Sequence, residues 1–278
     1  MKCKKILTAL LAAACTMSGC HGDLDIMQDN KLSASNMWID ESDAETATYG
    51  IYLYMRDALK SVHDIYLCWG EFRNGLWGAG TNKTLSGVDQ TQVRTSTMSS
   101  SNAYADWSVM YKTVNQANLI LKHVPEMGIS ESVRNFSLGN AYFSRAWCYF
   151  WIARIWGDAP LALTGYESTA GDLYLPRAPK AEIFARIESD LTEAERYVTD
   201  NSDKAVATPA AVQMLKADYA LWMYRVAGGG SSYLTMAEEA IETLNLSASR
   251  LESDYAQVFS SANKLNKEVI FAVHQANG

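Results

Sequence analysis

The sequence predicts a mostly α-helical protein, and three observations support this fold class. Proline is scarce, with 5 residues in 278, and Met is frequent, with 11. Such a composition favours long helices over many short strands and turns. Several stretches of about 20 residues place apolar side chains at steps of three and four, the spacing of one helix face. Because these stretches follow one another with short turns, we expect tetratricopeptide-like antiparallel helix pairs, an α-α superhelix, carrying long irregular loops.

Six segments carry this spacing or clear capping signals. They are residues 42–62, 103–124, 131–156, 180–198, 208–226 and 232–244. The segment 180–198 has the cleanest amphipathic stripe. Thr208 followed by Pro209 predicts an N-cap and a first-turn proline. We expect irregular structure at 68–101 and 157–179, and a short terminal strand over Glu268–Val273.

Charge and composition exclude whole classes of protein. The chain has 24 Lys+Arg against 31 Asp+Glu, a formal net charge of −7. This balance disfavours a nucleic-acid-binding protein, because neutralising phosphates requires a surplus of clustered cations. With 48% hydrophobic and 20% charged residues, the composition is globular and excludes global disorder.

The first 19 residues predict an export signal. Three Lys precede an apolar run from Ile6 to Ala14, which is too short for a spanning helix of about 20 residues. The tetrad MSGC, ending at Cys20, resembles a bacterial lipobox, whose cysteine is acylated after cleavage. We therefore predict a lipid anchor on Cys20. Cys15 is a weaker candidate, and an ordinary cleaved signal is the alternative.

Residues 20–36 are polar and acidic, which predicts a tether between the lipid and a helical domain over 37–278. Two further cysteines, Cys68 and Cys148, lie in that domain. An exported protein can form a disulfide. Because Cys148 sits among aromatic residues of a predicted helix, a buried free thiol is the other reading.

Known catalytic and metal-binding patterns are absent from the sequence. Gly78–Thr84 resembles a phosphate-binding loop but has Asn before Lys83 where that loop needs Gly. The four His show no metal-ligand spacing. Carboxylates such as Asp190 and Glu193 are expected on a solvated helix face. We predict no metal, no cofactor and no enzymatic activity.

An aromatic loop offers the one candidate binding chemistry. Its Trp residues are flat apolar surfaces on which the C–H faces of a neutral sugar can stack, and its amide and guanidinium groups can bond sugar hydroxyls. The alternative is that these aromatics hold the loop against the helices, with Arg73 paired to Glu71 or Asp64. The candidate ligand-binding residues are Trp69, Arg73, Asn74, Trp77 and Asn82.

Five segments in series carry a family resemblance. They are DWSVMYKTVNQANLIL at 106–121, GNAYFSRAWCYFWIARIWGDAPL at 139–161, RAP at 177–179 with IFARIESDLTEAE at 183–195, TPAA at 208–211, and EVIF at 268–271. In this order, after a lipobox, they resemble the SusD/RagB family, the surface glycan-binding lipoproteins of Bacteroidetes outer membranes. The resemblance covers essentially the whole chain after the signal.

The resemblance implies a function and a partner. Similar proteins bind glycans without catalysis, face the cell exterior from the outer membrane, and cover a TonB-dependent, SusC-like transporter to which they deliver oligosaccharide. Family members continue for about as long again beyond the EVIF segment, so we expect this chain to be truncated. Two other hypotheses remain: a tetratricopeptide-type envelope lipoprotein that scaffolds proteins or binds peptides, and a glycoside hydrolase.

Overall fold

The computed structural model describes residues 37–74, 76, 88–169, 173–244, 246 and 250–274. The chain divides into two units, Met1–Met37 and Trp38–Gly278, and the elements described here belong to the second. The predicted export signal, the lipidation residue Cys20 and the tether lie outside the described residues. Within the described ranges, no helix is both long and apolar enough to cross a membrane.

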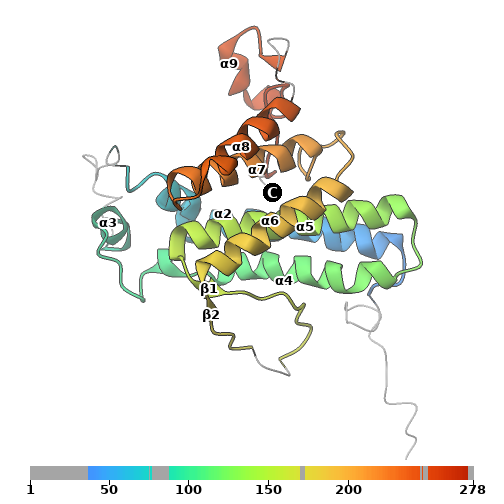
Figure 1. Cartoon of the computed structure of the whole chain (residues 1–278), viewed down its shortest axis with the longest axis horizontal. Helices are drawn as coiled ribbons and strands as arrows, with labels where there is room; N and C mark the ends of the chain where they lie inside the picture. Colours follow the sequence, from blue (N-terminus) through green and yellow to red (C-terminus); the bar gives the residue numbers. More distant parts are fainter. Residues whose placement is uncertain are drawn as a thin grey trace, which may run out of the picture. The chain divides into compact units, whose positions relative to one another are not determined.

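The predicted mostly α-helical fold is confirmed. The central helices lie side by side (Figure 1), and consecutive ones pack as neighbours, α4 on α5 and α5 on α6. A further pair, α7 and α8, packs together and contacts this group through α6 and α5. The central helices are α2 (Glu41–Gly70), α4 (Ser108–His123), α5 (Glu131–Trp156) and α6 (Lys180–Tyr197). The second pair is α7 (Pro209–Arg225) and α8 (Ser231–Thr243).

Shorter elements connect these helices. A two-residue antiparallel pairing joins Ala159 to Ala178 and Pro160 to Arg177. The short elements are α3 (Val88–Thr95), the 3₁₀ turns Ala103–Ala105, Val124–Glu126 and Ser261–Asn263, the strands β1 (Ala159–Pro160) and β2 (Arg177–Ala178), and α9 (Tyr255–Val258).

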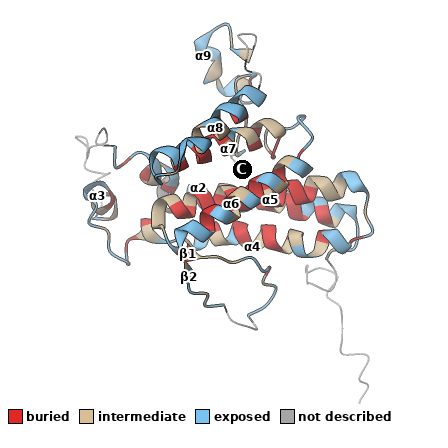
Figure 2. Cartoon of the chain, in the orientation of Figure 1, coloured by how far each residue is buried: buried red, intermediate tan, exposed pale blue. Residues whose placement is uncertain are grey.

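Helix α5 is the centre of the core. Figure 2 shows buried residues along most of its length, and its apolar side chains point to more than one side, as a helix covered all round requires. At Gly139 the chain after α6 comes so close that a Cβ would lie 2.7 Å from Val198 Cγ2 and 3.1 Å from its backbone nitrogen. Gly157, with φ of +71°, ends α5 in a left-handed conformation that favours glycine.

Arg145 and Asp190 form a buried ion pair in the core. Arg145 of α5 donates from Nε to Asp190 Oδ2 at 2.8 Å and from Nη2 to Oδ1 at 2.7 Å, and from Nη1 to Asn118 Oδ1 at 2.7 Å. Asp190 is fully buried, so the expectation that it lies on a solvated helix face is wrong. A two-pronged pair of this kind is strong because geometry and charge act together. It joins α4, α5 and α6 at one point.

Residues 160–167, which we call the strap, run along α4, and side chains of α4 and α5 bond the strap backbone. Tyr111 Oη donates to Pro160 O at 2.6 Å, and Asn118 Nδ2 to Ala162 O at 3.0 Å. Ala162 O also accepts from Tyr149 Oη at 2.7 Å. Asn115 donates to Tyr166 O at 3.0 Å and accepts from Tyr166 N at 2.8 Å. The path of this irregular segment is therefore fixed by α4.

Helix α2 is longer than predicted. It begins with a capping box between Asp40 and Asp43 and ends at Gly70, whereas the sequence indicated an end near Val62. Val62 has φ of +46°, which is unusual for a β-branched residue. The helix nevertheless continues, because Ile65 and Cys68 are buried in a second small cluster with Phe72, Val93 and Tyr104. Tertiary packing thus extends a helix whose local pattern had ended.

Two other predictions about local structure are wrong. Residues 88–95, expected to be loop, form α3; only Val93 of this helix is buried, so the segment lacks an apolar stripe. The terminal strand over Glu268–Val273 does not form among the described residues. Among the described residues that segment makes two backbone bonds, from Val269 N to Asn266 O at 3.2 Å and from Ala272 N to Lys204 O at 2.9 Å, and its Phe271 ring lies 5.3 Å from that of Phe143.

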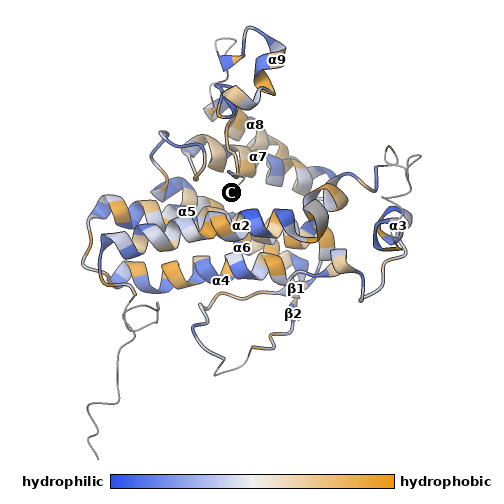
Figure 3. Cartoon of the chain, turned by 180° about the vertical axis from the view of Figure 1, so that it is seen from behind, coloured by the Kyte–Doolittle hydropathy of each residue, from blue (hydrophilic) through white to orange (hydrophobic). Residues whose placement is uncertain are grey.

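Apolar residues along α2 and α4 alternate with polar ones, as Figure 3 shows from behind.

Both described cysteines, Cys68 and Cys148, are free and buried, so the free-thiol reading of Cys148 is confirmed and no bridge joins the two. Burial raises the pKa of the Cys148 thiol and keeps it in the unreactive protonated form.

Candidate functional site

Trp69, the first predicted ligand residue, faces the interior. Its indole Nε1 donates to Tyr104 O at 2.9 Å, and its ring lies 5.2 Å from that of Trp156 and 6.0 Å from that of Trp151. The indole N–H is therefore already used within the protein. Trp69 anchors the end of α2 on α5, which is the packing role that the sequence left open as the alternative.

Arg73 and Asn74 lie on the outside, directly after α2. Arg73 Nε donates to Val93 O at 3.4 Å, and its Nη2 lies 3.8 Å from Met98 Sδ. Asn74 Nδ2 donates to Glu71 Oε2 at 2.6 Å, and Asn74 Oδ1 accepts from Leu76 N at 2.8 Å. Both side chains are exposed and held in place by neighbours. They differ in this from Trp69, which is partly buried and packs on α5.

The two remaining predicted ligand residues, Trp77 and Asn82, lie outside the described residues. Hydrogen bonds hold the described residues before and after these two positions. Asn102 Nδ2 donates to Asp89 O at 3.1 Å and to Gln92 Oε1 at 2.9 Å, and Gln90 Nε2 donates to Tyr104 Oη at 3.0 Å. Burial raises the pKa of Tyr104 to about 12, so its hydroxyl stays protonated. This anchoring fixes where the segment leaves and rejoins the helices.

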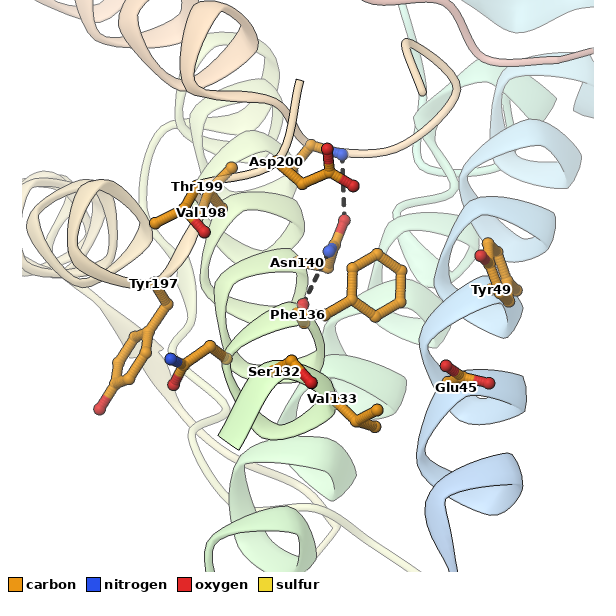
Figure 4. Close-up of a pocket in the computed structure, with 12 residues that line it drawn as sticks. Glu45, Tyr49, Ser132, Val133, Phe136, Asn140, Tyr197, Val198, Thr199 and Asp200 are labelled. Atoms are coloured by element: carbon orange, nitrogen blue, oxygen red, sulfur yellow. Dashed lines mark hydrogen bonds between the residues drawn. The ribbon is translucent and has the colours of Figure 1, made fainter. Parts of the chain in front are cut away.

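A second candidate surface is a pocket of about 370 Å³ between α2, the first turns of α5 and the chain after α6. Figure 4 shows Phe136 of α5 pointing toward α2, where Tyr49 and Glu45 form the opposite wall. The rings of Tyr49 and Phe136 lie 5.7 Å apart. Tyr49 is 52% exposed, so much of its ring remains open to a ligand.

Some polar side chains in this pocket form hydrogen bonds with other described residues, and others form none. Asn140 bonds Tyr52 Oη, Ala207 N and Phe136 O, and the two Asn140 bonds to Ala207 and Phe136 are dashed in Figure 4. By contrast, the side chains of Glu45, Asn135 and Thr199 form no hydrogen bond with any other described residue. Their carboxylate, amide and hydroxyl groups are available to a bound molecule.

The charge in the pocket is negative. Hydrogen bonds from the Ser202 side chain and backbone hold the pKa of Asp200 below its usual value, so this carboxyl is ionised at neutral pH. Exposed aromatic faces beside an amide, a hydroxyl and carboxylates fit a neutral polyhydroxylated ligand better than an anion. Within the described residues, no group of three or more His, Cys, Asp or Glu is placed to hold a metal ion.

The sequence did not reveal this pocket. Its walls come from three segments far apart in the chain, and none of them carries a motif. Tyr49 fell on the predicted helix 42–62, where its spacing indicated a core residue. The sequence did contain one indication of an exposed aromatic residue. Tyr49 and Tyr54 fall on different faces of that helix, and a single buried stripe cannot cover both.

Comparison with known proteins places the chain in a family. A family model described as "Starch-binding associating with outer membrane" matches residues 79–225, more than half of the chain. The chain belongs to the SusD-like family. The match includes α3 to α7 with the strap, and it includes the buried Arg145 and Asp190.

Relatives agree with this assignment. SusD-like protein P38 of Formosa agariphila is 26% identical over 190 residues, which cover 68% of this chain and 36% of the relative. Among solved structures, B. fragilis NanU has a TM-score of 0.72 and 30% identity, covering 89% of this chain and 50% of that one. A SusD superfamily protein from Bacteroides fragilis has a TM-score of 0.72 at 26% identity, covering 87% and 50%. The chain thus spans about a third to a half of the length of these relatives.

Proposed function

We propose that this SusD-like protein is a surface-exposed lipoprotein that captures oligosaccharide and delivers it to a TonB-dependent outer-membrane transporter. The observation that carries the proposal is the match of residues 79–225 to a family described as starch-binding and associated with the outer membrane. The aromatic and amide-rich surfaces described above supply the matching chemistry. The protein binds its glycan and does not cleave it.

We place the main glycan contact at the end of α2. Arg73 and Asn74 are exposed there and held by Val93 and Glu71, so their polar groups are oriented before a ligand arrives. Trp77 and Asn82 follow within ten residues, and the proposed contact includes them for the stacking ring and the amide that they carry. Trp69 takes a positioning role, because its indole is bonded to Tyr104.

Substitution of Trp77 tests this placement. Loss of one stacking ring costs about 1 to 3 kcal/mol of binding free energy, so we expect Trp77→Ala to weaken binding to a panel of soluble glycans by about tenfold or more in calorimetry. Leu76→Ala is the matched control, because Leu76 is the adjacent residue and is 87% exposed. Equal affinities of the two variants for the best glycan would contradict the placement.

The pocket in Figure 4 is a second candidate surface, favoured by its unused polar groups beside an open ring. Tyr49→Ala tests it. Tyr54→Ala is a matched control, since Tyr54 is 41% exposed on the same helix and lies outside the pocket lining. If Tyr49→Ala loses glycan affinity and Tyr54→Ala does not, the pocket contacts the glycan. If the two variants have equal affinities, the pocket is not a glycan-binding surface.

The lipid anchor and the partner are tested together. We expect the tagged protein, extracted in mild detergent from its own membranes, to carry acyl chains on Cys20 and to co-purify with a SusC-like barrel. Cys20→Ala should abolish both acylation and membrane retention, because acyl chains contribute about 0.8 kcal/mol per buried CH₂. Recovery of envelope proteins or peptides without a barrel would favour the scaffold alternative, and release of reducing sugar from a bound glycan would favour a hydrolase.

A further inference from the structure

A separate hollow of about 470 Å³ lies between α4 and the segment that links β1 to β2. Figure 1 shows this long segment leaving β1 along α4 and returning to β2. Its walls are Trp107, Tyr111 and Val114 on the α4 side and Tyr166, Leu173 and Leu175 on the other. It shares none of its lining with the pocket of Figure 4 or with the predicted ligand residues at the end of α2.

Part of the wall of this hollow, the strap and the start of β2, is held in place by contacts with α4 and β1. The strap is fastened to α4 through the backbone of Pro160, Ala162 and Tyr166. At the other end, β2 pairs with β1, and the Arg177 guanidinium lies 4.6 Å from the centre of the Trp107 ring. Because these contacts already order this part of the wall, less conformational entropy is lost when a ligand binds, and this favours binding.

Polar side chains in the lining are already engaged with the protein. Tyr111 Oη donates to Pro160 O, and Asn115 forms two bonds with the Tyr166 backbone. Asn118 bonds Arg145 and Ala162, and Ser108 Oγ donates to Asp106 at 2.8 Å. A sugar entering here leaves hydroxyls without partners, and each unpaired buried polar group is costly. The hollow is therefore unlike the polar pocket of Figure 4.

Aromatic faces and aliphatic side chains are what the lining offers to a ligand. An apolar cavity of about 150 Å³ is sufficient to bind benzene, and ligand pockets span about 300 to 1,000 Å³. We infer that the hollow between α4 and the β1–β2 segment binds an uncharged aryl group, either as a small free molecule or as a substituent on a larger one. The ring lies against Trp107 and Tyr111, with Leu173 and Leu175 covering it.

Saturation-transfer NMR with the full chain tests this inference. The probes are benzyl alcohol for a free aryl group, phenyl β-D-glucoside for an aryl group on a sugar, and methyl β-D-glucoside for the sugar alone. We expect both aryl probes to bind and to compete with each other, with the ring protons nearest the protein, and methyl β-D-glucoside not to displace benzyl alcohol. Binding of benzyl alcohol alone identifies a free aryl ligand as the source.

Two variants of one residue and a control locate the site. Leu173 is 42% exposed, so Leu173→Asp places a carboxylate in the lining and Leu173→Trp fills the space, and neither disturbs the core. We expect each to weaken benzyl alcohol binding by about tenfold. Leu163→Asp, at a site 41% exposed on the same segment and outside the lining, should leave it unchanged.

Unchanged binding in both Leu173 variants, no aryl binding at all, or displacement by methyl β-D-glucoside would each overturn the inference. Circular dichroism confirms that the variants are folded. The result does not depend on the proposed glycan function: loss of glycan binding in Trp77→Ala with intact benzyl alcohol binding separates the two sites.

Discussion

Two of the places where the strap is fastened to the helices differ in burial: the inner fastening at Ala162 and the outer fastening at Glu167. At Ala162 it is held by Tyr149 and Asn118, and Asn118 is in turn bonded to the buried pair of Arg145 and Asp190. At Glu167 it is held by Lys122 Nζ and by His123 Nε2, the latter at 2.8 Å. The side chains of the outer fastening are 24% to 45% exposed, whereas that of Asp190 is 0% exposed.

Hydrogen bonds of similar length in the two fastenings therefore contribute differently to the free energy of unfolding. When a bond of the outer fastening breaks, water replaces the lost partner, and exposed ion pairs contribute about 0 to 1 kcal/mol. The side chains of Asn118 and Tyr149 in the inner fastening are buried, so water replaces a broken bond there less readily and a polar group is left unpaired at a greater cost in free energy. The comparison teaches that burial of the partners, more than the number of bonds, decides what holds the strap. Four substitutions test it.

Asp190→Asn has the largest expected effect. It leaves the buried Arg145 guanidinium without its counter-charge, and removing one partner of a buried pair costs about 3 to 5 kcal/mol of the free energy of unfolding. Urea denaturation measures this loss. The matched control is Asp218→Asn, whose pair with Arg154 spans 3.4 Å and whose side chain is 52% exposed. Equal losses of unfolding free energy in the two variants would contradict the conclusion that burial of the partners decides the contribution of a bond.

Asn118→Ala is expected to rank second. It removes a hydrogen bond to the charged Arg145 and a donor to the strap carbonyl of Ala162. Hydrogen bonds to charged groups are worth about 1.5 to 3 kcal/mol, so the urea midpoint should fall by less than in Asp190→Asn. A loss below 1 kcal/mol would mean that Asn118 does not support the inner fastening.

Tyr149→Phe should cost about 1 kcal/mol, because Ala162 O keeps its bond from Asn118. The double variant with Asn118→Ala removes both donors from that carbonyl. We therefore expect the double loss to exceed the sum of the single losses by 0.5 kcal/mol or more, as residues sharing a partner do not act independently. Additive losses in a double-mutant cycle would show that the two donors act separately.

Glu167→Gln has the smallest expected effect, less than about 1 kcal/mol at neutral pH, and it depends on pH. The hydrogen bond from Lys122 and then that from His123 lower the pKa of the Glu167 carboxyl. Stability from a lowered pKa is present above the ordinary carboxyl value and is lost as the pH falls through the native value. The difference between wild type and variant should vanish once the pH is below the lowered pKa of this carboxyl in the native state. A difference that persists there would rule out the carboxylate as its source.

Prediction from sequence succeeded where one apolar pattern determined the element. Helices α5 and α6 follow the stripes read from 131–156 and 180–198 within a residue at each end, because burial of one face or of all faces leaves a regular trace. The pattern failed at α3, whose only buried residue is Val93, and at the end of α2, where contacts with Tyr104 and Val93 extend the helix. Such contacts join distant segments and leave no local periodicity.

The surroundings of the candidate ligand residues could be predicted from the sequence only in part. Arg73 and Asn74 are exposed, as a ligand contact requires, but the orientation of Trp69 depends on a bond to Tyr104, 35 residues away. Composition identifies residues able to stack on a sugar, and it does not tell which face of a helix they occupy. The pocket of Figure 4 was missed for the same reason, since Tyr49 and Thr199 meet only in the folded chain.

Helix α4 recognises the strap by its backbone. Tyr111, Asn115 and Asn118 bond backbone carbonyl and amide groups of the strap, so an exposed position such as Leu163 can exchange its side chain while the strap keeps its course. Gly165 cannot, because a Cβ there would lie 2.9 Å from Leu119 N. Variation among descendants of this gene is therefore expected at the exposed positions of the strap. The neighbouring hollow is a place where ligand preference can drift while the scaffold stays constant.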